Sequence, residues 1–348
     1  MSNYFVSEVH SYDLRAHDQV NQLLLNEGIR RDANLDYTCG IFDELGNALA
    51  TGSCFGNTLR CLAVSSDHQG EGLMNEIVTH LIGHQFSRGN THLFLYTKCD
   101  SAKFFEDLGF YRIIEIPGHL VFMENNRTGF SDYLETLAKE KVNAHKIAAI
   151  VMNANPFSLG HLHLIEKAAA ENDILHLFIV SEDSSLIPFS VRKQLVISGT
   201  THLSNICYHE TGSYMISSAT FPSYFQKDHD DIAKGHALLD LTLFVQIANA
   251  LGIQKRYVGH EPNSHVTNLY NETMKQKLPE SGICCTEIPR ITAGSEIISA
   301  STIRVAIKDG DFDRLRSLVP KSTYEYFLSP EAIPVIERIR HAENIIHH

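Results

Sequence analysis

The segment Asn155–His161, with the sequence NPFSLGH, holds residue types whose spacing suits chemistry on a phosphate group. It follows the apolar run Ile147–Met152, which predicts a buried strand, and precedes a helical pattern with apolar Leu162, Ile165 and Ala169. A helix that begins at the carboxyl edge of a strand presents free N–H groups and the positive end of its dipole, and both favour an anion. The segment therefore predicts a phosphate-binding turn.

Two side chains of this turn could contact the same ligand. Ser158 and His161 are three residues apart and would share one side of the first helical turn. Pro156 keeps the residue before it out of the helical conformation, and Gly160 lets the backbone approach a ligand closely. The alternative is that Ser158 is only a helix cap, because serine is among the commonest caps, and that His161 is a surface histidine.

A second segment, Ile298–Arg304 (ISASTIR), also stands at the predicted start of a helix. Its hydroxyl groups and its arginine could bind a phosphate, although the segment taken alone would also be interpreted as a cap. The two segments together resemble the (H/T)-x-G-H and I-S-S-T-x-x-R motifs of the nucleotidyltransferase superfamily, which bracket a nucleoside triphosphate. Ser158 stands where that motif has His or Thr, and it keeps a hydroxyl group.

A more specific resemblance extends over nearly the whole chain. The stretches MNANPFSLGHLHLIEKAA, TFPSYFQKD (Thr220–Asp228), YVGHEP (Tyr257–Pro262) and ISASTIR resemble the citrate (pro-3S)-lyase ligase family. This resemblance implies that ATP and acetate are used to acetylate the thiol of the CoA-like prosthetic group on the acyl carrier subunit of citrate lyase. The implied route is an acetyl-adenylate, with release of AMP and pyrophosphate. Acetate has a carboxyl pKa of about 4–5, so it is ionised at neutral pH and needs no general base.

The resemblance also implies roles for the residues of the two motifs. Ser158 and His161 would hydrogen-bond phosphate oxygens as negative charge redistributes in the transition state, so His161 acts as an electrostatic stabiliser and not as a base. Mg²⁺ would bridge the phosphates, bound largely through them and water. The departing pyrophosphate would be held by one guanidinium and three hydroxyl groups: Arg304, Ser299, Ser301 and Thr302.

Other candidates rest on their position beside these motifs. Asn155 and Phe157 are expected to shape the nucleotide site. Gly259 and Glu261 end a later predicted strand, where adenine or ribose contacts are expected in a doubly wound sheet. Two basic residues are candidates for phosphate or acetate contacts, the alternative being ordinary solvated side chains: Arg192 and Lys227.

The N-terminal part contains a glycine loop after a predicted strand. Gly70 and Gly72 resemble the acetyl-CoA pyrophosphate loop of GNAT-type N-acetyltransferases, and Phe104–Phe110 (FFEDLGF) resembles a later motif of that fold. Asp67 stands where the loop has Gln or Arg, and a carboxylate near a pyrophosphate is unfavourable. We therefore do not expect independent acetyltransferase activity. The domain would bind a CoA-like group or only support the partner enzyme.

The length of 348 residues predicts two domains. Residues 1–126 are predicted to form a GNAT-like α+β domain, with a hairpin turn at Asp43–Asn47, and residues 127–144 a linker helix. Residues 145–348 alternate strands and helices, which predicts a doubly wound, Rossmann-like parallel sheet. Its later elements are expected at Ile174–Val180, Ile206–His209, Ala233–Leu251, Arg256–Val258 and Cys284–Ile288.

Bulk properties exclude several classes of protein. The formal net charge of −12 argues against nucleic-acid binding, which needs concentrated Lys and Arg. The sequence has neither an apolar run of about 20 residues nor a secretory signal pattern, so a cytoplasmic location without membrane contact is expected. The seven scattered cysteines are expected to be reduced, with Cys284 and Cys285 in the core and none catalytic. No zinc site is expected, because His161 and His163 would point to different sides of a helix.

Two other functions remain open at this stage. A different adenylyltransferase, acting on a pantetheine- or nucleotide-like acceptor, would share the phosphate motifs but retain AMP in its product. A non-catalytic CoA-binding regulatory protein would bind ATP without exchanging pyrophosphate into it. Neither the oligomeric state nor the docking surface for the lyase follows from the sequence.

Overall fold

A computed structural model describes residues 4–32, 34–215, 221, 229–260, 265–293 and 296–342. The chain divides into two compact units. Unit 1 comprises residues 1–132 and 222–235, and unit 2 comprises residues 133–221 and 236–348. Among the described residues, no helix is both long enough and apolar enough to cross a membrane.

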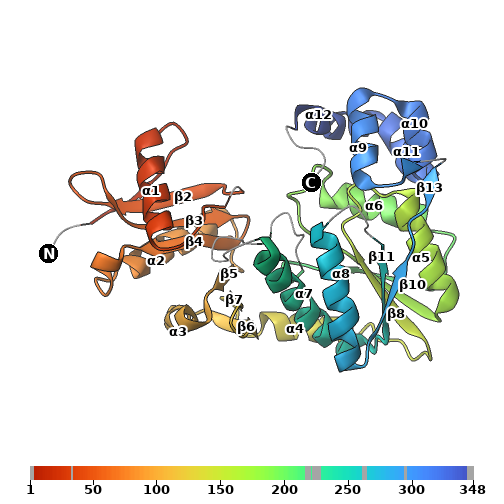
Figure 1. The fold of residues 1–348 in the computed structure, drawn as a ribbon, viewed down its shortest axis with the longest axis horizontal. Coiled ribbons are helices and arrows are strands. Elements are labelled where there is room, and N and C mark those ends of the chain that lie inside the picture. The colour runs from red at the N-terminus through yellow and green to blue at the C-terminus, as the bar shows by residue number, and fades with distance from the viewer. Residues whose placement is uncertain are drawn as a thin grey trace. The chain divides into compact units, whose positions relative to one another are not determined.

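Unit 1 is built from a mixed sheet and three helices (Figure 1). Its strands are β1 (Val6–Glu8), β2 (Tyr37–Phe42), β3 (Ala48–Phe55), β4 (Thr58–Val64), β5 (Phe94–Thr97), β6 (Tyr111–Ile116) and β7 (Leu120–Glu124). Its helices are α1 (Leu14–Asn26), α2 (Leu73–Ser87) and α3 (Ala102–Asp107), with short 3₁₀ turns at Ser66–His68 and Cys99–Ser101.

The strand order β1-β2-β3-β4-β5-β7-β6 gives unit 1 the expected GNAT-like α+β fold. All neighbouring strands are antiparallel except β4 and β5, which pair in parallel only at Thr58↔Phe94 and Leu59↔Leu95. Beyond these two pairs, β4 and β5 no longer hydrogen-bond to each other. The apolar faces of α2 and α3 pack in one core cluster with the sheet, whereas α1 packs in another.

The predicted hairpin is confirmed, because β2 and β3 pair around the turn at Asp43. One Asp43 carboxylate oxygen accepts from the backbone N–H groups of Leu45 and Asn47. The sequence analysis did not identify α1. Only Val20, Leu23 and Leu24 of its thirteen residues are buried. Their i, i+3, i+4 spacing is the helical signal that could have identified it.

Unit 2 holds a second sheet and most of the helices. Its strands are β8 (Ile147–Met152), β9 (Ile174–Ile179), β10 (Ile206–Glu210), β11 (Lys255–Gly259) and β12 (Cys284–Ile288), with the short pair β13 (Thr292–Ala293) and β14 (Glu296–Ile297). Its helices are α5 (Leu159–Glu171), α6 (Phe189–Gly199), α8 (His265–Lys277), α9 (Ala300–Asp309), α10 (Phe312–Leu318), α11 (Lys321–Leu328) and α12 (Ile333–His341). Helices α4 (Gly129–Ala138) and α7 (His229–Leu251) include the residues at which the two units divide.

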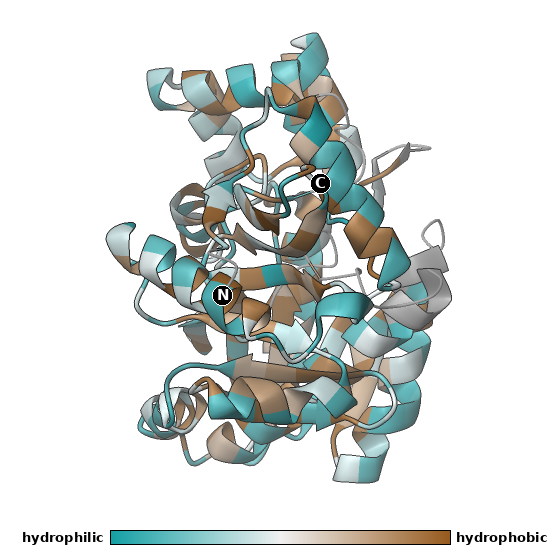
Figure 2. Ribbon diagram, turned by 90° about the vertical axis from the view of Figure 1, so that its left-hand side faces the viewer, coloured by the Kyte–Doolittle hydropathy of each residue, from teal (hydrophilic) through white to brown (hydrophobic). Residues whose placement is uncertain are grey.

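The predicted doubly wound sheet is confirmed in unit 2. Its five strands are parallel and follow the order β10-β9-β8-β11-β12. Side chains of the central strand β8 alternate between two cores: Ala148, Ile150 and Met152 share a cluster with α5 and α6, whereas Ile147 and Ala149 share one with α7 and α8. The central strand β8 is accordingly apolar along its whole length. Figure 2 colours the ribbon by residue hydropathy.

The strand order reverses at β8, whose neighbours are β9 and β11. In a doubly wound sheet, ligands bind beyond the carboxyl ends of the strands at such a switch point. Here those ends are Met152 and Gly259. Helices α9 to α12 form a further apolar cluster, which also contains Leu186, Ile187 and Ile298 from the segments that follow the sheet.

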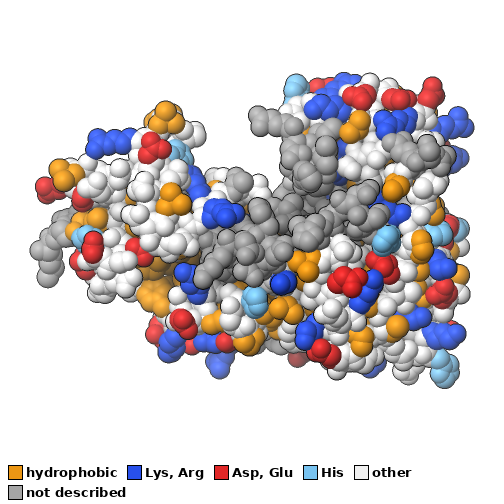
Figure 3. All heavy atoms as spheres, viewed as in Figure 1, with side chains coloured by type: hydrophobic (Ala, Val, Ile, Leu, Met, Phe, Trp, Pro, Cys, Tyr) orange, Lys and Arg blue, Asp and Glu red, His pale blue; other side chains and the backbone are white. Residues whose placement is uncertain are grey.

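One expectation about the core is wrong. Cys285 is partly buried in β12, but Cys284 is exposed, because β12 is an edge strand and its first residue lies at the surface. Acidic and basic side chains are mixed over the face drawn in Figure 3.

Candidate nucleotide site

The turn after β8 ends in a reciprocal cap. Ser158 is buried and is the N-cap of α5, and its Oγ accepts a hydrogen bond from the His161 backbone N–H at 3.1 Å. In return, the Ser158 backbone N–H donates to His161 Nδ1 at 3.1 Å. The capping interpretation of Ser158 is therefore correct. The same cap holds the imidazole of His161 in a fixed orientation.

This cap determines the protonation of His161. Its Nδ1 accepts from a backbone N–H, so the neutral ring carries its proton on Nε2. Burial, together with the positive charge of nearby Arg290, lowers the His161 pKa to about 4. The imidazole is consequently neutral at pH 7 and can act as a donor through Nε2–H. The buried Phe157 ring supports it from the side, with ring centroids 6.1 Å apart and an interplanar angle of 11°.

The start of α9 gathers three hydroxyl groups. Ser299 caps this helix by accepting from the Thr302 backbone N–H at 3.1 Å. Its Oγ also lies 2.9 Å from Ser301 Oγ and 2.8 Å from Thr302 Oγ1. All three side chains are only partly buried, so the cluster stands at an accessible helix N-terminus. Such an end is well suited to an anion.

The structure brings the two sequence motifs into contact. A Cβ added to Gly160 would lie 3.6 Å from the carbonyl oxygen of Ile298. Arg304, which is buried, donates from Nη1 to the carbonyl oxygen of Asn155 at 2.6 Å. Burial lowers the Arg304 pKa to about 10, so the guanidinium stays charged at neutral pH. Residues almost 150 positions apart thus form one site.

Asn155 is held on two sides and has one amide group without a partner. Its Oδ1 accepts from the Ile187 backbone N–H at 3.2 Å, and its carbonyl oxygen accepts from Arg304. Its Nδ2 is buried and has no hydrogen-bond partner in the described part of the chain. Orphaned buried donors are uncommon in folded proteins, and at a site they mark a place for a ligand acceptor or water.

Arg192 has an interior place that the sequence analysis did not anticipate. It is fully buried, and its guanidinium donates to the carbonyl oxygens of Asn153, Val180, Glu182 and Ile187. Burial lowers its pKa to about 10. This placement favours a role in organising the loop after β9 over direct contact with a phosphate or acetate.

Arg290 is a site residue that the sequence analysis missed. It follows the carboxyl end of β12, donates from Nε to the His260 carbonyl oxygen at 2.9 Å, and is close enough to His161 to lower its pKa. Burial lowers the pKa of Arg290 itself. The rule that ligands bind beyond the carboxyl ends of strands would have found it, because only Pro289 separates it from β12.

The remaining candidates divide between described and undescribed parts of the chain. Gly259 ends β11, and its carbonyl oxygen accepts from Asn271 Nδ2 at 3.1 Å. No atom would lie within 4 Å of a Cβ added there, so the backbone is open to approach. Glu261, Lys227 and most of Thr220–Asp228 lie outside the described residues.

The donor set of the site fits a metal ion that arrives with phosphates. Within the described ranges, no group of three or more His, Cys, Asp or Glu side chains could hold a metal ion. The site offers instead neutral imidazole, hydroxyl groups and guanidinium groups. Mg²⁺ prefers oxygen ligands and keeps several waters, so phosphate oxygens and water would supply its coordination here.

Unit 1 has its own cavity, of about 650 Å³, where β4 and β5 separate. Gly70 and Gly72 line it and have φ angles of 86° and 82°, which L side chains rarely adopt. Gly72 is the N-cap of α2 and provides no side-chain cap. The Glu27 carboxylate also lines this cavity, so its rim is acidic at one point.

Unit 2 combines a doubly wound parallel sheet, a histidine turn at the switch point of that sheet, and a helix start rich in hydroxyl groups. This combination defines a nucleotidyltransferase-like domain. Residues 147–327 match the family model described as the citrate lyase ligase C-terminal domain. The citrate (pro-3S)-lyase ligase of Escherichia coli K12 is 40% identical over 306 residues, which cover 85% of this chain and 86% of the relative. The chain belongs to the citrate lyase ligase family.

Two further comparisons are with a second citrate lyase ligase and with a solved structure. The Haemophilus influenzae citrate (pro-3S)-lyase ligase is 36% identical over 88% of this chain and 93% of its own. A solved structure of a putative nicotinate-nucleotide adenylyltransferase from Vibrio parahaemolyticus is 18% identical, covers 57% of this chain and 96% of its own, and has a TM-score of 0.36.

Proposed function

We propose that this protein is an acid–thiol ligase that activates citrate lyase. It uses ATP and acetate to acetylate the thiol of the CoA-like prosthetic group on the acyl carrier subunit, through an acetyl-adenylate, and releases AMP and pyrophosphate. Membership of the citrate lyase ligase family supports this activity. The observation in the structure that carries the proposal is the contact between the His161 turn and the start of α9, at Gly160 and Ile298.

In the first half-reaction an acetate oxygen attacks the α-phosphorus and pyrophosphate leaves. Neutral His161 would donate from Nε2–H to a phosphate oxygen, since its Nδ1 is already used by Ser158. A donor aimed at developing charge lowers the barrier without any proton transfer. Ionised acetate supplies its own lone pair, so no general base is required.

The leaving pyrophosphate would be stabilised from α9 and from the segment after β12. The hydroxyl groups of Ser299, Ser301 and Thr302 lie at the helix N-terminus, where the dipole also favours an anion. Arg304 holds the turn through Asn155 and adds positive charge beside it. Arg290 supplies a second positive charge near His161. Mg²⁺ would be held by the phosphates and water and would offset their charge.

The other nucleotide contacts are proposed from position. Asn155 has a buried Nδ2 donor without a protein partner in the described part of the chain, and the Phe157 ring stacks on that of His161. At Gly259 no atom lies within 4 Å of an added Cβ, so a ligand can approach the backbone on that side. Glu261 and Lys227 are retained as candidates for ribose and for phosphate or acetate contacts. Arg192 is assigned to the loop behind the site.

In the second half-reaction, a thiolate of the partner attacks the carbonyl carbon of the acetyl-adenylate, and AMP leaves. The thiol belongs to the prosthetic group, so no cysteine of this chain is needed. Burial raises the pKa of Cys39, Cys54 and Cys61 above the ordinary thiol value, and these groups are unsuited to nucleophilic attack.

The cavity of unit 1, with Gly70 and Gly72 in its wall, is proposed to receive the CoA-like arm of the partner. The lining combines the carboxyl side chain of Glu27 with the ammonium side chain of Lys98, and Asp67 stands where the GNAT loop has Gln or Arg, so independent acetyltransferase activity is not expected. We assign residues 1–126 to this role, residues 145–348 to catalysis, and residues 127–144 to the connection. The protein is proposed to act in the cytoplasm, without nucleic acid or membrane.

The test is the nucleotide product formed by the full chain from ATP. Free AMP should appear in amounts equal to acetylated prosthetic group, and only when acetate and deacetylated citrate lyase are both present. Retention of AMP in the acceptor product would favour another adenylyltransferase. ATP binding without any turnover under these conditions would favour a non-catalytic CoA-binding regulatory protein.

A further inference from the structure

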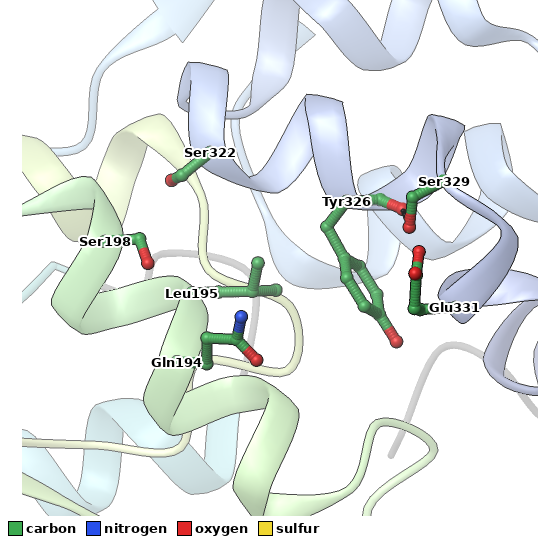
Figure 4. A pocket seen from close by; sticks show the side chains of 7 residues that line it. All are labelled: Gln194, Leu195, Ser198, Ser322, Tyr326, Ser329 and Glu331. Atoms are coloured by element: carbon green, nitrogen blue, oxygen red, sulfur yellow. Dashed lines mark hydrogen bonds between the residues drawn. The ribbon is translucent and has the colours of Figure 1, made fainter.

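A second cavity, of about 360 Å³, lies in unit 2 between α6 and α11 (Figure 4). It contains no residue of the His161 turn or of the α9 motif. The α6 side chains Gln194, Leu195 and Ser198 lie on one side of it, and the ring of Tyr326 lies on the other. The volume is in the range of small-molecule pockets and is roughly ten times the share of liquid volume of one water molecule.

Two hydroxyl groups that belong to lining side chains are buried and unsatisfied. Within the described ranges, neither Ser322 Oγ nor Tyr326 OH has a hydrogen-bond partner. Both side chains project from α11. A buried hydroxyl group without a protein partner is unfavourable. Both oxygens are shielded by the cavity wall, so a bound molecule has to displace that wall slightly to bond them.

The charge of the lining selects the class of ligand. Glu331 contributes a carboxylate, and the Ser329 hydroxyl that bonds it lowers its pKa, so it is ionised at neutral pH. None of the residues that line the cavity is Lys, Arg or His. Acetate, phosphates and citrate would therefore be repelled. The remaining polar groups are hydroxyl groups and the Gln194 amide, which pair with ligand groups that both donate and accept.

We propose that this cavity is a second binding site for an uncharged polyhydroxylated molecule of about pentose size, and that its occupancy is transmitted to His161. Ligand hydroxyl groups would bond Tyr326 OH, Ser322 Oγ and the Glu331 carboxylate. The C–H face of such a molecule would pack on Leu195 and on the Tyr326 ring. The cavity thus combines an aromatic face with a carboxylate and an amide.

The route to His161 passes through Gly199, the last residue of α6. A Cβ added to Gly199 would lie 3.0 Å from Ser322 Oγ and 2.6 Å from Phe157 Cε1. The cavity wall and the aromatic ring that stacks on His161 therefore meet at this glycine. A ligand that pulls Ser322 towards the cavity changes the packing against Gly199 and hence against Phe157.

Binding is tested with D-ribose as the probe, by ligand-observed NMR on the full chain. Saturable millimolar binding is expected, weakened about tenfold, or about 1.4 kcal/mol, by Tyr326→Phe and by Glu331→Gln. The matched controls Tyr324→Phe and Glu325→Gln alter side chains of α11 that do not line the cavity and should leave binding unchanged. D-ribose 5-phosphate should bind at least tenfold more weakly than ribose. Absence of saturable ribose binding, or equal binding by the cavity and control variants, overturns the proposal.

Transmission is tested in the same protein by the imidazole signals of His161. Saturating ribose should shift them in wild type, and the shift should be lost in Tyr326→Phe but kept in Tyr324→Phe. This readout needs neither ATP nor citrate lyase, so it stands or fails independently of the proposed ligase activity. Ribose that binds at this cavity without moving the His161 signals would refute the transmission, and a cavity that holds ordered water only would show neither effect.

Discussion

The Ser158 backbone N–H donates to His161 Nδ1 at 3.1 Å, and this bond defines which ring nitrogen of His161 carries the proton. The residue that begins the helix thereby orients the group that is proposed to stabilise the phosphate. Helix capping and ligand binding are not alternatives at this turn, because the cap leaves Nε2–H as the donor.

Replacing His161 should remove that donor from the transition state. His161→Ala is expected to lower turnover by about 100- to 1000-fold, with a smaller effect on ATP binding. His163→Ala is the matched control, since His163 stands on the same helix two residues on and should change turnover little. Steady-state kinetics for both variants make the comparison. Near-normal acetyl-adenylate formation by His161→Ala would exclude the assigned role.

The low pKa of His161 predicts a flat pH profile near neutrality. Because the group titrates at about 4, its protonation should produce no inflection in turnover between about pH 6 and 8. NMR titration of the His161 ring in the free protein gives its pKa directly. An inflection near the ordinary histidine value of about 6.5 that disappears in His161→Gln would show that burial does not hold the ring neutral.

Arg290 should act on both the nucleotide and the histidine. Arg290→Gln removes a positive charge, so ATP binding should weaken and the His161 pKa should rise, because the arginine lowers it. Arg338→Gln, on the exposed side of α12, is the control and should alter neither quantity. ATP titration and the His161 NMR titration supply the two readouts. An unchanged His161 pKa in Arg290→Gln would contradict the electrostatic coupling.

Gly199 should tolerate no side chain. In Gly199→Ala the Cβ would meet Phe157 Cε1 at 2.6 Å, so we expect a loss of about 1–3 kcal/mol in unfolding free energy and lower turnover. Gly83→Ala is the contrasting variant: Gly83 lies inside α2 with no atom within 4 Å of an added Cβ, and alanine should stabilise the helix slightly. Urea denaturation of both variants distinguishes steric clash from helix propensity.

The sequence was sufficient to predict the parallel sheet and the two site motifs, because buried strands, caps and turns leave local patterns. Arg192 and Arg290 could not be assigned in the same way. A charged side chain is usually exposed, and nothing local indicates that Arg192 is buried under four carbonyl oxygens. The exposed position of Cys284 likewise depends on β12 being an edge strand, which is a property of sheet order.

Contact between the motifs was predicted only through resemblance. Local pattern places Gly160 after β8 and Ile298 before α9, but no periodicity shows that the two lie together. The segment after β12 brings the chain back to the carboxyl end of β8. Packing of Leu159 against the apolar cluster of α9 to α12 sets this path. Glu261 and Lys227 could not be compared, since they lie outside the described residues.

Two buried histidines should make unit 2 sensitive to mild acid. His176 Nδ1 and His209 Nε2 lie 2.7 Å apart, and burial lowers both pKa values to about 4 from 6.5. Between these values the unfolded chain binds more protons, so the unfolding free energy should fall as pH decreases from about 6.5 towards 4. Each group contributes at most about 1.4 kcal/mol per pH unit. Urea denaturation at pH 7 and pH 5 tests this, and the double variant His176→Leu/His209→Leu should show a smaller difference.

Acetate-dependent exchange of labelled pyrophosphate into ATP, without any lyase present, is the most direct test of the adenylation site. We expect exchange by the full chain with ATP, Mg²⁺ and acetate, none when acetate is omitted, and a loss of about 100-fold or more in His161→Ala. Exchange that proceeds equally without acetate, or that is unchanged in His161→Ala, would contradict the assignment of acetate activation to this turn.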